Sequence, residues 1–252
     1  MPYTIRHMLR EETAGIFDWE KKTGWNFGVH DWGVMYDIDP DGYFVGVLDG
    51  EIIGCIGGVS YAGKYGYLTL FMVRPGFRGQ RYGLALWKHA LHYLNDEVGV
   101  ECVGLDAVLE REKDYAKWGF HSDYRITGYT YDVKDKFRRR YPPIEEKHFA
   151  DIAEYDLKMF KVDRSSFIHD FIFKTDARTG VAYDGNKLVG FTIARPAWRG
   201  YKVGPVFADN AEVAEGLLES AMADLQGQMI TIEIPEPNKS ALKIARDYQM
   251  ES

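Results

Sequence analysis

The chain has 252 residues, of which 46% are hydrophobic and 27% charged, and its formal net charge at pH 7 is -7. This balance is that of an ordinary soluble globular protein, long enough for one large domain or two small ones. The negative net charge and the lack of a basic face argue against nonspecific binding to nucleic acid.

The two cysteines, Cys55 and Cys102, lie far apart in the sequence and have no metal-ligand spacing. They exclude a disulfide framework and predict a reduced, cytoplasmic chain without a bound metal. The N-terminus has no apolar signal-peptide core, and no run of about 18 apolar residues follows. We therefore expect neither a secretion signal nor a membrane span.

The first half alternates expected strands and helices. Asp49-Gly50 is the dipeptide of a tight hairpin turn between two apolar runs. The stretch 79–95 carries apolar residues at helical spacing and predicts an amphipathic helix. Strands are expected at 3–8, 43–48, 52–61, 66–73 and 101–108, one or two further strands at 120–133, and the other helices at 10–23 and 110–118.

The second half repeats the first with an offset of about 135 residues, which indicates a duplicated domain. Asp184-Gly185 repeats the hairpin turn, helices are expected at 212–225 and 239–248, and a strand is expected at 230–234. No counterpart of the 120–133 strands follows, so either the second copy is incomplete or the sequence has been cut short.

Between the halves, two prolines in the stretch 136–143 block both a helix and a central strand, so this stretch is interpreted as a linker. The sequence therefore predicts a catalytic domain over 1–135, a linker over 136–143 and a degenerate domain over 144–252.

The chemistry is expected at the turn that follows the strand 66–73. A Pro-Gly turn and a glycine-containing loop lead into a long helix, whose first amides lack internal partners and carry the positive end of the helix dipole. A diphosphate fits there, since Gly79 and Gly83 permit close backbone approach and Arg78 and Arg81 add positive charge. The matching stretch of the second half is acidic and lacks these glycines, so no phosphate is expected there.

Two common phosphate-binding motifs, GxxxxGK[ST] and GxGxxG, are absent. The run 73–85, VRPGFRGQRYGLA, resembles the signature of the GCN5-related N-acetyltransferase (GNAT) superfamily, in which V-x-P leads into R-G-x-G-x-G/A. Arg81 stands where the first glycine of the G-x-G pair is usual. The run 115–120, YAKWGF, resembles the later family motif Y-x-x-x-G-F. In outline the resemblance extends to the second half, as in tandem GNAT proteins.

This resemblance implies an α/β fold with a mixed, mostly antiparallel sheet flanked by helices, duplicated with a second, incomplete half. It implies an acetyl-CoA-dependent N-acetyltransferase, in which a primary amine attacks the thioester directly in a ternary complex. Acetyl-CoA would lie between the strands 66–73 and 101–108. The residues expected to contact it are Phe71, Met72, Val73, Arg78, Gly79, Gln80, Arg81, Tyr82, Gly83, Leu84, Ala85 and Tyr115.

The resemblance also implies catalytic roles. The backbone N–H near Phe71 would hold the developing oxyanion, and Tyr115 would protonate the departing thiolate. A neutral amine requires a base or a water relay. Asp106 and Glu110 are candidate bases, and so are His30 and Asp31 on the loop before the second strand. Tyr67 and Thr69 stand at strand positions where some relatives have a Glu or His, and neither offers a carboxylate or an imidazole.

The acceptor side is expected in the stretch 24–32, which mixes aromatic and acidic residues. Trp25, Asn26, His30 and Asp31 are the candidate acceptor-binding residues, although Trp25 is as readily interpreted as a buried packing residue. Aromatic faces beside carboxylates suit a cation, so the sequence predicts a small polyamine, a lysine-like side chain or an amino sugar as acceptor. The second half is expected to shape the acceptor cleft without binding acetyl-CoA.

Other interpretations stay open. The chain could bind CoA as a non-catalytic sensor or scaffold, because no base is evident and the second half is degenerate. The run 58–62, GVSYA, approaches the hydrolase motif G-x-S-x-G but lies in a hairpin strand. His89 and His92 are three residues apart on a helix without a third metal ligand. The acyl length and the oligomeric state are not specified by the sequence.

Overall fold

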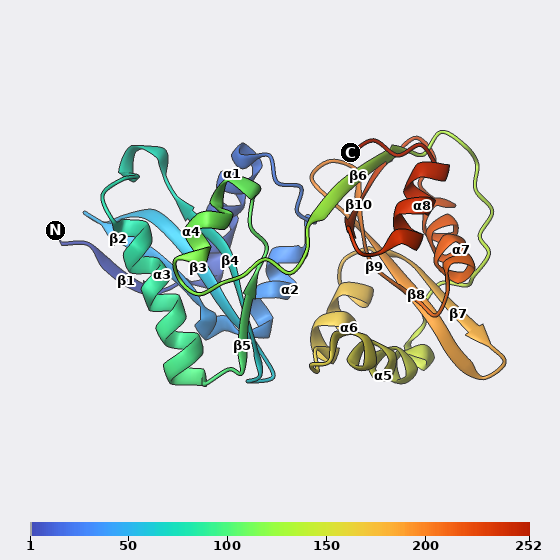
Figure 1. The fold of residues 1–252 in the computed structure, drawn as a ribbon, viewed down its shortest axis with the longest axis horizontal. Coiled ribbons are helices and arrows are strands. Elements are labelled where there is room, and N and C mark those ends of the chain that lie inside the picture. Colours follow the sequence, from blue (N-terminus) through green and yellow to red (C-terminus); the bar gives the residue numbers. More distant parts are fainter. Residues whose placement is uncertain (1) are drawn as a thin grey trace. The chain divides into compact units, whose positions relative to one another are not determined.

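The structure, a computed structural model, describes residues 2–252, and its chain divides into two compact units (Figure 1). The first unit comprises the chain up to Thr23 together with Met35–His121, and the second comprises Gly24–Val34 and Ser122–Ser252. Each unit contains one five-stranded mixed sheet flanked by helices. The α/β, duplicated fold expected from the sequence is thereby confirmed.

The sheet of the first unit has the strand order β1-β2-β3-β4-β5, antiparallel except for the parallel pair β4–β5. Its core lies between this sheet and α3, where Leu86 of α3 and Leu94 of the helical segment that follows (Tyr93–Val98) form one cluster with Phe44 and Leu68. The elements are β1 (Thr4–His7), α1 (Thr13–Thr23), β2 (Tyr43–Leu48), β3 (Glu51–Tyr61), β4 (Tyr65–Val73), α3 (Tyr82–His92), β5 (Cys102–Leu105) and α4 (Glu112–Ala116), with α2 (Asp31–Ile38) crossing the boundary at Val34.

The sheet of the second unit has the strand order β6-β10-β9-β8-β7, antiparallel except for the parallel pair β9–β10. One cluster packs α5 and α6 on β7 and β8, and a second packs α7 on β8, β9 and β10. The elements are β6 (Ile126–Asp132), α5 (Phe149–Phe160), α6 (Ser165–Phe173), β7 (Arg178–Asp184), β8 (Lys187–Pro196), β9 (Tyr201–Ala208), α7 (Ala211–Met222), β10 (Met229–Pro235) and α8 (Lys239–Asp247).

The position of β6 corrects the domain boundary expected at residue 135. This strand pairs antiparallel with β10 over its whole length, from Ile126 opposite Pro235 to Asp132 opposite Met229. It therefore supplies the strand that the second half lacks when read alone. The alternation of residues within a strand shows which of its faces is buried but not which sheet it joins, so the sequence pattern could not place it.

The expected linker 136–143 is also part of the second unit and packs on it. The backbone N–H groups of Arg140 and Tyr141 both donate to the Ser220 hydroxyl, at 3.0 and 2.9 Å. The Arg139 guanidinium donates to the Thr179 carbonyl at 3.1 Å. The two bonds to Ser220 satisfy backbone N–H groups of a proline-containing stretch that has no ladder of its own.

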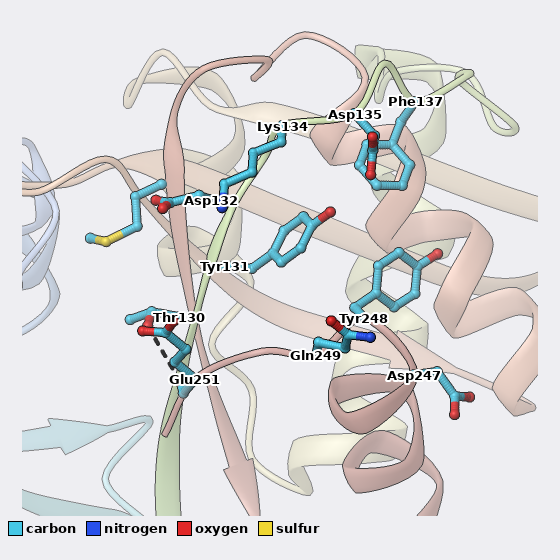
Figure 2. Close-up of a pocket in the computed structure, with 11 residues that line it drawn as sticks. Thr130, Tyr131, Asp132, Lys134, Asp135, Phe137, Asp247, Tyr248, Gln249 and Glu251 are labelled. Carbon is cyan, nitrogen blue, oxygen red and sulfur yellow. Dashed lines mark hydrogen bonds between the residues drawn. The ribbon is translucent and has the colours of Figure 1, made fainter.

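The second unit also contains a cavity of about 680 Å³, between β6, the end of α8 and the chain that follows each of them (Figure 2). The rings of Tyr131 and Tyr248 lie edge to face in its wall, with centroids 6.0 Å apart. Four carboxylates and one lysine make the wall acidic, which is unfavourable for a pyrophosphate. The lining residues are Thr130, Tyr131, Asp132, Lys134, Asp135, Phe137, Met229, Asp247, Tyr248, Gln249 and Glu251.

Among residues 2–252, no helix combines the length and the apolar character that crossing a bilayer requires. Among the side chains that the structure describes, no three of His, Cys, Asp or Glu form a group that could hold a metal ion.

Candidate active site

A β-bulge in β4 forms the centre of the candidate site. The register between β3 and β4 shifts between Cys55 and Gly57, so Ile56 faces both Leu70 and Phe71. Leu70 has a φ of 56°, in the left-handed region, and its carbonyl accepts a hydrogen bond from the Cys55 thiol at 3.2 Å. A bulge releases one residue from the ladder and redirects its backbone groups. The sequence-predicted oxyanion donor near Phe71 therefore lies at an interruption of the sheet.

Beyond this bulge, β4 has a free edge. The parallel pair β4–β5 spans only four residue pairs, from Tyr65 opposite Cys102 to Leu68 opposite Leu105. β4 continues to Val73, whereas β5 ends at Leu105. Within the described chain, no strand pairs with the β5-facing edge of β4 after Leu68. An extended ligand with amide groups can add to such an edge as a further strand would.

The loop after β4 is compact because two of its residues are left-handed. Gly79 has a φ of 78° and Arg81 a φ of 67°, and α3 begins directly after Arg81. The Arg78 Nε donates to the Val73 carbonyl at 2.8 Å, which ties the loop to the end of β4. The first amides of α3 therefore lie beside this loop, in the arrangement that binds phosphate groups at helix starts.

Gly83 brings α3 close to the bulge. A Cβ atom on Gly83 would lie 3.2 Å from Val73 Cγ2 and 3.3 Å from the Phe71 ring, tighter than an ordinary contact. Tyr82 packs instead on Tyr3, with ring centroids 4.6 Å apart. Of the other residues expected to contact acetyl-CoA, Met72 is buried, Ala85 is half-buried, and Arg78, Gln80 and Leu84 are exposed.

Tyr115 lies in an aromatic cluster on the α4 side of α3. Its ring centroid is 5.2 Å from that of Trp87, which also contacts Phe71 at 5.7 Å and Phe120 at 5.7 Å. Burial raises the pKa of Tyr115 above its ordinary value of 10, and the nearby Arg111 opposes part of this shift. The phenol therefore stays protonated near neutral pH and is available as an acid.

Asp106 and Glu110, the two candidate bases, have different surroundings. Asp106 follows β5 and accepts a hydrogen bond from the Tyr67 hydroxyl at 2.7 Å. Burial and the charge of Asp106 hold the pKa of Tyr67 well above its ordinary value, so Tyr67 remains the donor. Glu110 is exposed in the short helical turn Leu109–Arg111. The structure thus brings Asp106 to β4 through Tyr67, a pairing that the sequence spacing did not predict.

Asp31, expected at the acceptor side, is buried in the second unit with an exposed fraction of 3%. One carboxylate oxygen accepts from Arg195 Nε at 2.9 Å, and the other accepts from Arg195 Nη2 at 3.2 Å and from the Gly28 N–H at 3.0 Å. The guanidinium of Arg195 also stacks on the Phe171 ring, 4.0 Å from its centroid. These contacts make Asp31 the anchor of its own segment.

The other three acceptor candidates belong to the same segment. Asn26 exchanges two hydrogen bonds with the backbone of Arg199, at 3.0 and 2.8 Å. His30 lies 3.6 Å from the Asp176 carboxylate, and its side chain is 45% exposed. Trp25 is at the surface, with an exposed fraction of 36%. Trp25 and His30 are thus accessible, and the acceptor role of all four residues stays a prediction.

Two family models match the chain, one in each half. Residues 5–120 match the acetyltransferase (GNAT) family, and residues 152–252 match the acetyltransferase (GNAT) domain. The chain belongs to the GNAT superfamily. It is an N-acyltransferase of the tandem type, since both GNAT domains lie in one chain.

Three proteins are similar to the chain over most of its length. The chain is 28% identical to the holothin acyltransferase of Pseudoalteromonas sp. (strain SANK 73390), over 92% of this chain and 79% of that protein. Its fold is similar to that of a putative acetyltransferase from Pyrococcus horikoshii, with a TM-score of 0.77 at 21% identity, covering 99% and 85% of the two chains. A tandem GNAT protein from the clavulanic acid biosynthesis pathway has a TM-score of 0.67 at 13% identity, covering 99% and 95%.

The second GNAT domain repeats the bulge with different chemistry. In β8, Ile193 faces both Gly204 and Pro205 of β9, so Pro205 takes the place of Phe71. Proline has no backbone N–H and cannot donate to an oxyanion. The Gly204 carbonyl accepts from Arg195 Nη1 at 2.5 Å, which places a guanidinium at this bulge.

The start of α7 in the second domain also differs from the start of α3. The Asn210 side chain caps α7 by accepting from the Val213 N–H at 3.0 Å. Asp209, just before it, pairs with Lys187 at 2.8 Å and accepts from the Tyr155 hydroxyl at 2.8 Å. A helix start that is capped by its own side chain and flanked by a carboxylate is a poor phosphate site.

Proposed function

We propose that the first GNAT domain transfers an acetyl group from acetyl-CoA to the primary amine of a small cationic molecule or a lysine-like side chain. The observation that carries this proposal is the continuous path formed by the β4 bulge, the free edge of β4 and the left-handed loop that enters α3. Each part of the path matches one part of an acyl-CoA, whose thioester supplies an activated acetyl group.

The loop suits the pyrophosphate. Gly79 and Arg81 turn the chain so that the first amides of α3 are available, while Gly83 keeps the helix close to β4. Exposed Arg78 and Arg81 add positive charge at this point. The free edge between Thr69 and Val73 offers backbone N–H and C=O groups to the amides of the pantetheine arm.

In this proposal the acceptor amine attacks the thioester carbonyl carbon directly. A C–N bond forms, the C–S bond breaks, and the sulfur leaves as a thiolate that takes the Tyr115 proton. The bulge at Phe71 orients a backbone N–H toward the carbonyl oxygen as negative charge develops there. No enzyme nucleophile is required, because the amine performs the attack.

The attacking nitrogen must lose one proton before it bonds and a second after it. Asp106 is the group that we assign to accept one of these protons, directly or through water. The Tyr67 hydroxyl donates to the Asp106 carboxylate at the point where β4 and β5 separate. Glu110 is the second candidate, at an exposed position on the turn that precedes α4.

For the acceptor, the accessible Trp25 and His30 are the members of the predicted set that we assign to contact it. Asn26 and Asp31 would hold their segment in place through Arg199 and Arg195. An aromatic face and an acidic chain overall favour a cation. One relative is a holothin acyltransferase, so holothin belongs in an acceptor panel beside polyamines, lysine peptides and amino sugars. Cys55 and Cys102 form no disulfide, which fits a reducing compartment, and we propose that the reaction takes place in the cytoplasm.

The first experiment is a thermal-shift titration with acetyl-CoA, followed by the acceptor panel with detection of released thiol. At 100 times its dissociation constant a ligand stabilises the folded state by about 2.7 kcal/mol, which corresponds to roughly 5–10 °C for a protein of this size. A shift together with thiol release that depends on the acceptor supports the proposal. A shift without turnover on any amine would instead favour a CoA sensor, and no shift would remove acetyl-CoA from the proposal.

A further inference from the structure

Trp87 carries a buried hydrogen-bond donor that the folded chain does not use. Its exposed fraction is 3%, and within the described chain its indole Nε1 has no hydrogen-bond partner. A buried donor without a partner is costly and is rare in native structures, so each one calls for an explanation. A ligand that supplies the acceptor atom is one such explanation.

The surroundings of Trp87 indicate which ligand this is. Its ring contacts Phe71 at the β4 bulge and Tyr115 on α4, the two residues whose groups are assigned to the thioester. Trp118 and Phe120 complete the cluster, at 6.1 and 5.7 Å from the Trp87 ring. The unused N–H therefore lies among the residues expected around the thioester end of an acyl-CoA.

We propose that the Trp87 indole N–H donates a hydrogen bond to the pantetheine arm of acyl-CoA, next to the thioester. This inference rests on the proposed function and adds a side-chain donor to the backbone groups of β4. An arm that adds to a strand edge pairs its amides with the backbone on one side only, so acceptor atoms on its other side need donors from elsewhere. An indole N–H is a donor only and suits an amide carbonyl.

The test compares the binding of three ligands to wild type and to Trp87→Phe, which keeps a ring and removes the N–H. The ligands are acetyl-CoA, CoA, and 3′-phosphoadenosine 5′-diphosphate, which has the nucleotide and pyrophosphate but no arm. Loss of one neutral hydrogen bond predicts about threefold to tenfold weaker binding of acetyl-CoA and CoA. Binding of the armless nucleotide should not change. Trp198→Phe is the control, since Trp198 lies in the second unit, outside this cluster, and is 50% exposed.

An independent measurement uses the wild-type protein. Among the indole N–H signals of its six tryptophans, that of Trp87 should move downfield on addition of CoA and stay in place with the armless nucleotide. The signal is assigned by its absence in Trp87→Phe or, if that variant does not fold, as the one that persists when each of the other five tryptophans is replaced by Phe in turn.

The outcomes separate this inference from the proposed function. If wild type binds neither CoA nor acetyl-CoA, the proposed function fails, and the role of Trp87 fails with it. If wild type binds both and Trp87→Phe binds them equally tightly, only the role of Trp87 is refuted. A loss confined to acetyl-CoA, or one shared by the armless nucleotide, would also overturn the assignment to the arm.

Discussion

Arg81 combines a strained backbone with a charge at the proposed pyrophosphate site, and the two effects can be separated by substitution. Its φ of 67° lies in the left-handed region, at the residue just before α3. For a residue with a Cβ atom this conformation costs roughly 1–2 kcal/mol, whereas glycine adopts it freely. The GNAT pattern usually has glycine at this position.

Arg81→Gly should therefore stabilise the unliganded protein. Relief of the strain contributes about 1–2 kcal/mol, and the greater freedom of glycine in the unfolded chain offsets about 0.4–1 kcal/mol of it. The net gain of about 0.5–1 kcal/mol raises Tm by roughly 1–4 °C for a chain of this length. Arg81→Ala is the matched control, since it removes the charge but keeps the strain.

Binding should follow the charge and not the strain. Both variants lose one exposed cation, worth about 0.5–1 kcal/mol, so the Kd for CoA should rise about twofold to fivefold in each. The ratio of each variant's Kd to that of wild type should fall as the salt concentration rises from about 0.05 to about 0.5 M, because salt screens an exposed charge. Calorimetric titration measures the Kd, and thermal unfolding measures Tm. If Arg81→Gly is less stable than Arg81→Ala, or if both bind CoA as wild type does, the account of this loop is refuted.

Two further predictions follow from the structure. Arg195→Ala should lower the free energy of unfolding by about 3–5 kcal/mol in urea denaturation, because it leaves the buried Asp31 carboxylate unpaired. The double variant that combines Asp31→Asn with Arg195→Met should recover most of this loss, because no buried charge is then left unpaired. Lys243→Ala, at the exposed Lys243–Asp247 pair, is the control and should change the free energy of unfolding by no more than about 0.5 kcal/mol. Equal losses in Arg195→Ala and Lys243→Ala would contradict the argument. Tyr115→Phe should lower kcat about 100-fold, and this factor should be the same at every pH from about 7 to about 9.5. The reason is that burial disfavours the phenolate and raises the pKa of Tyr115 above 10. The prediction is wrong if the kcat of wild type falls below pH 9 on the alkaline side and this fall is absent in Tyr115→Phe, since Tyr115 would then ionise in that range.

The sequence predicted most of the fold because its strands and helices carry clear local signals. The Asp49-Gly50 and Asp184-Gly185 turns both join antiparallel strands, β2 to β3 and β7 to β8, as expected. The sequence could not assign β6 to its sheet or Gly24–Val34 to its unit. Those placements depend on pairing between distant residues, such as Ile126 with Pro235, and local periodicity carries no information on such partners.

The sequence could propose site residues where a role would follow from backbone position, as in the loop that enters α3, and those roles stay predictions. The Tyr67–Asp106 hydrogen bond was not predicted, because it depends on the register of a four-residue parallel pair. Trp87 was not singled out either, because the spacing of apolar residues along a helix cannot show whether an indole N–H has a hydrogen-bond partner. Its unused N–H becomes visible only when every neighbour is known.

The second domain shows that a GNAT sheet can keep its bulge after losing the groups that give the bulge its proposed chemistry. At Phe71 the released residue has an N–H, whereas at Pro205 it has none. Arg195 lies at this bulge, and its guanidinium donates to the Gly204 carbonyl and to the Asp31 carboxylate at once. A bulge that presents backbone groups can therefore either receive a ligand or fix a segment of its own chain. In this protein the first domain is suited to the former, and in the second domain the structure shows the latter, which anchors Gly24–Val34 through a buried ion pair.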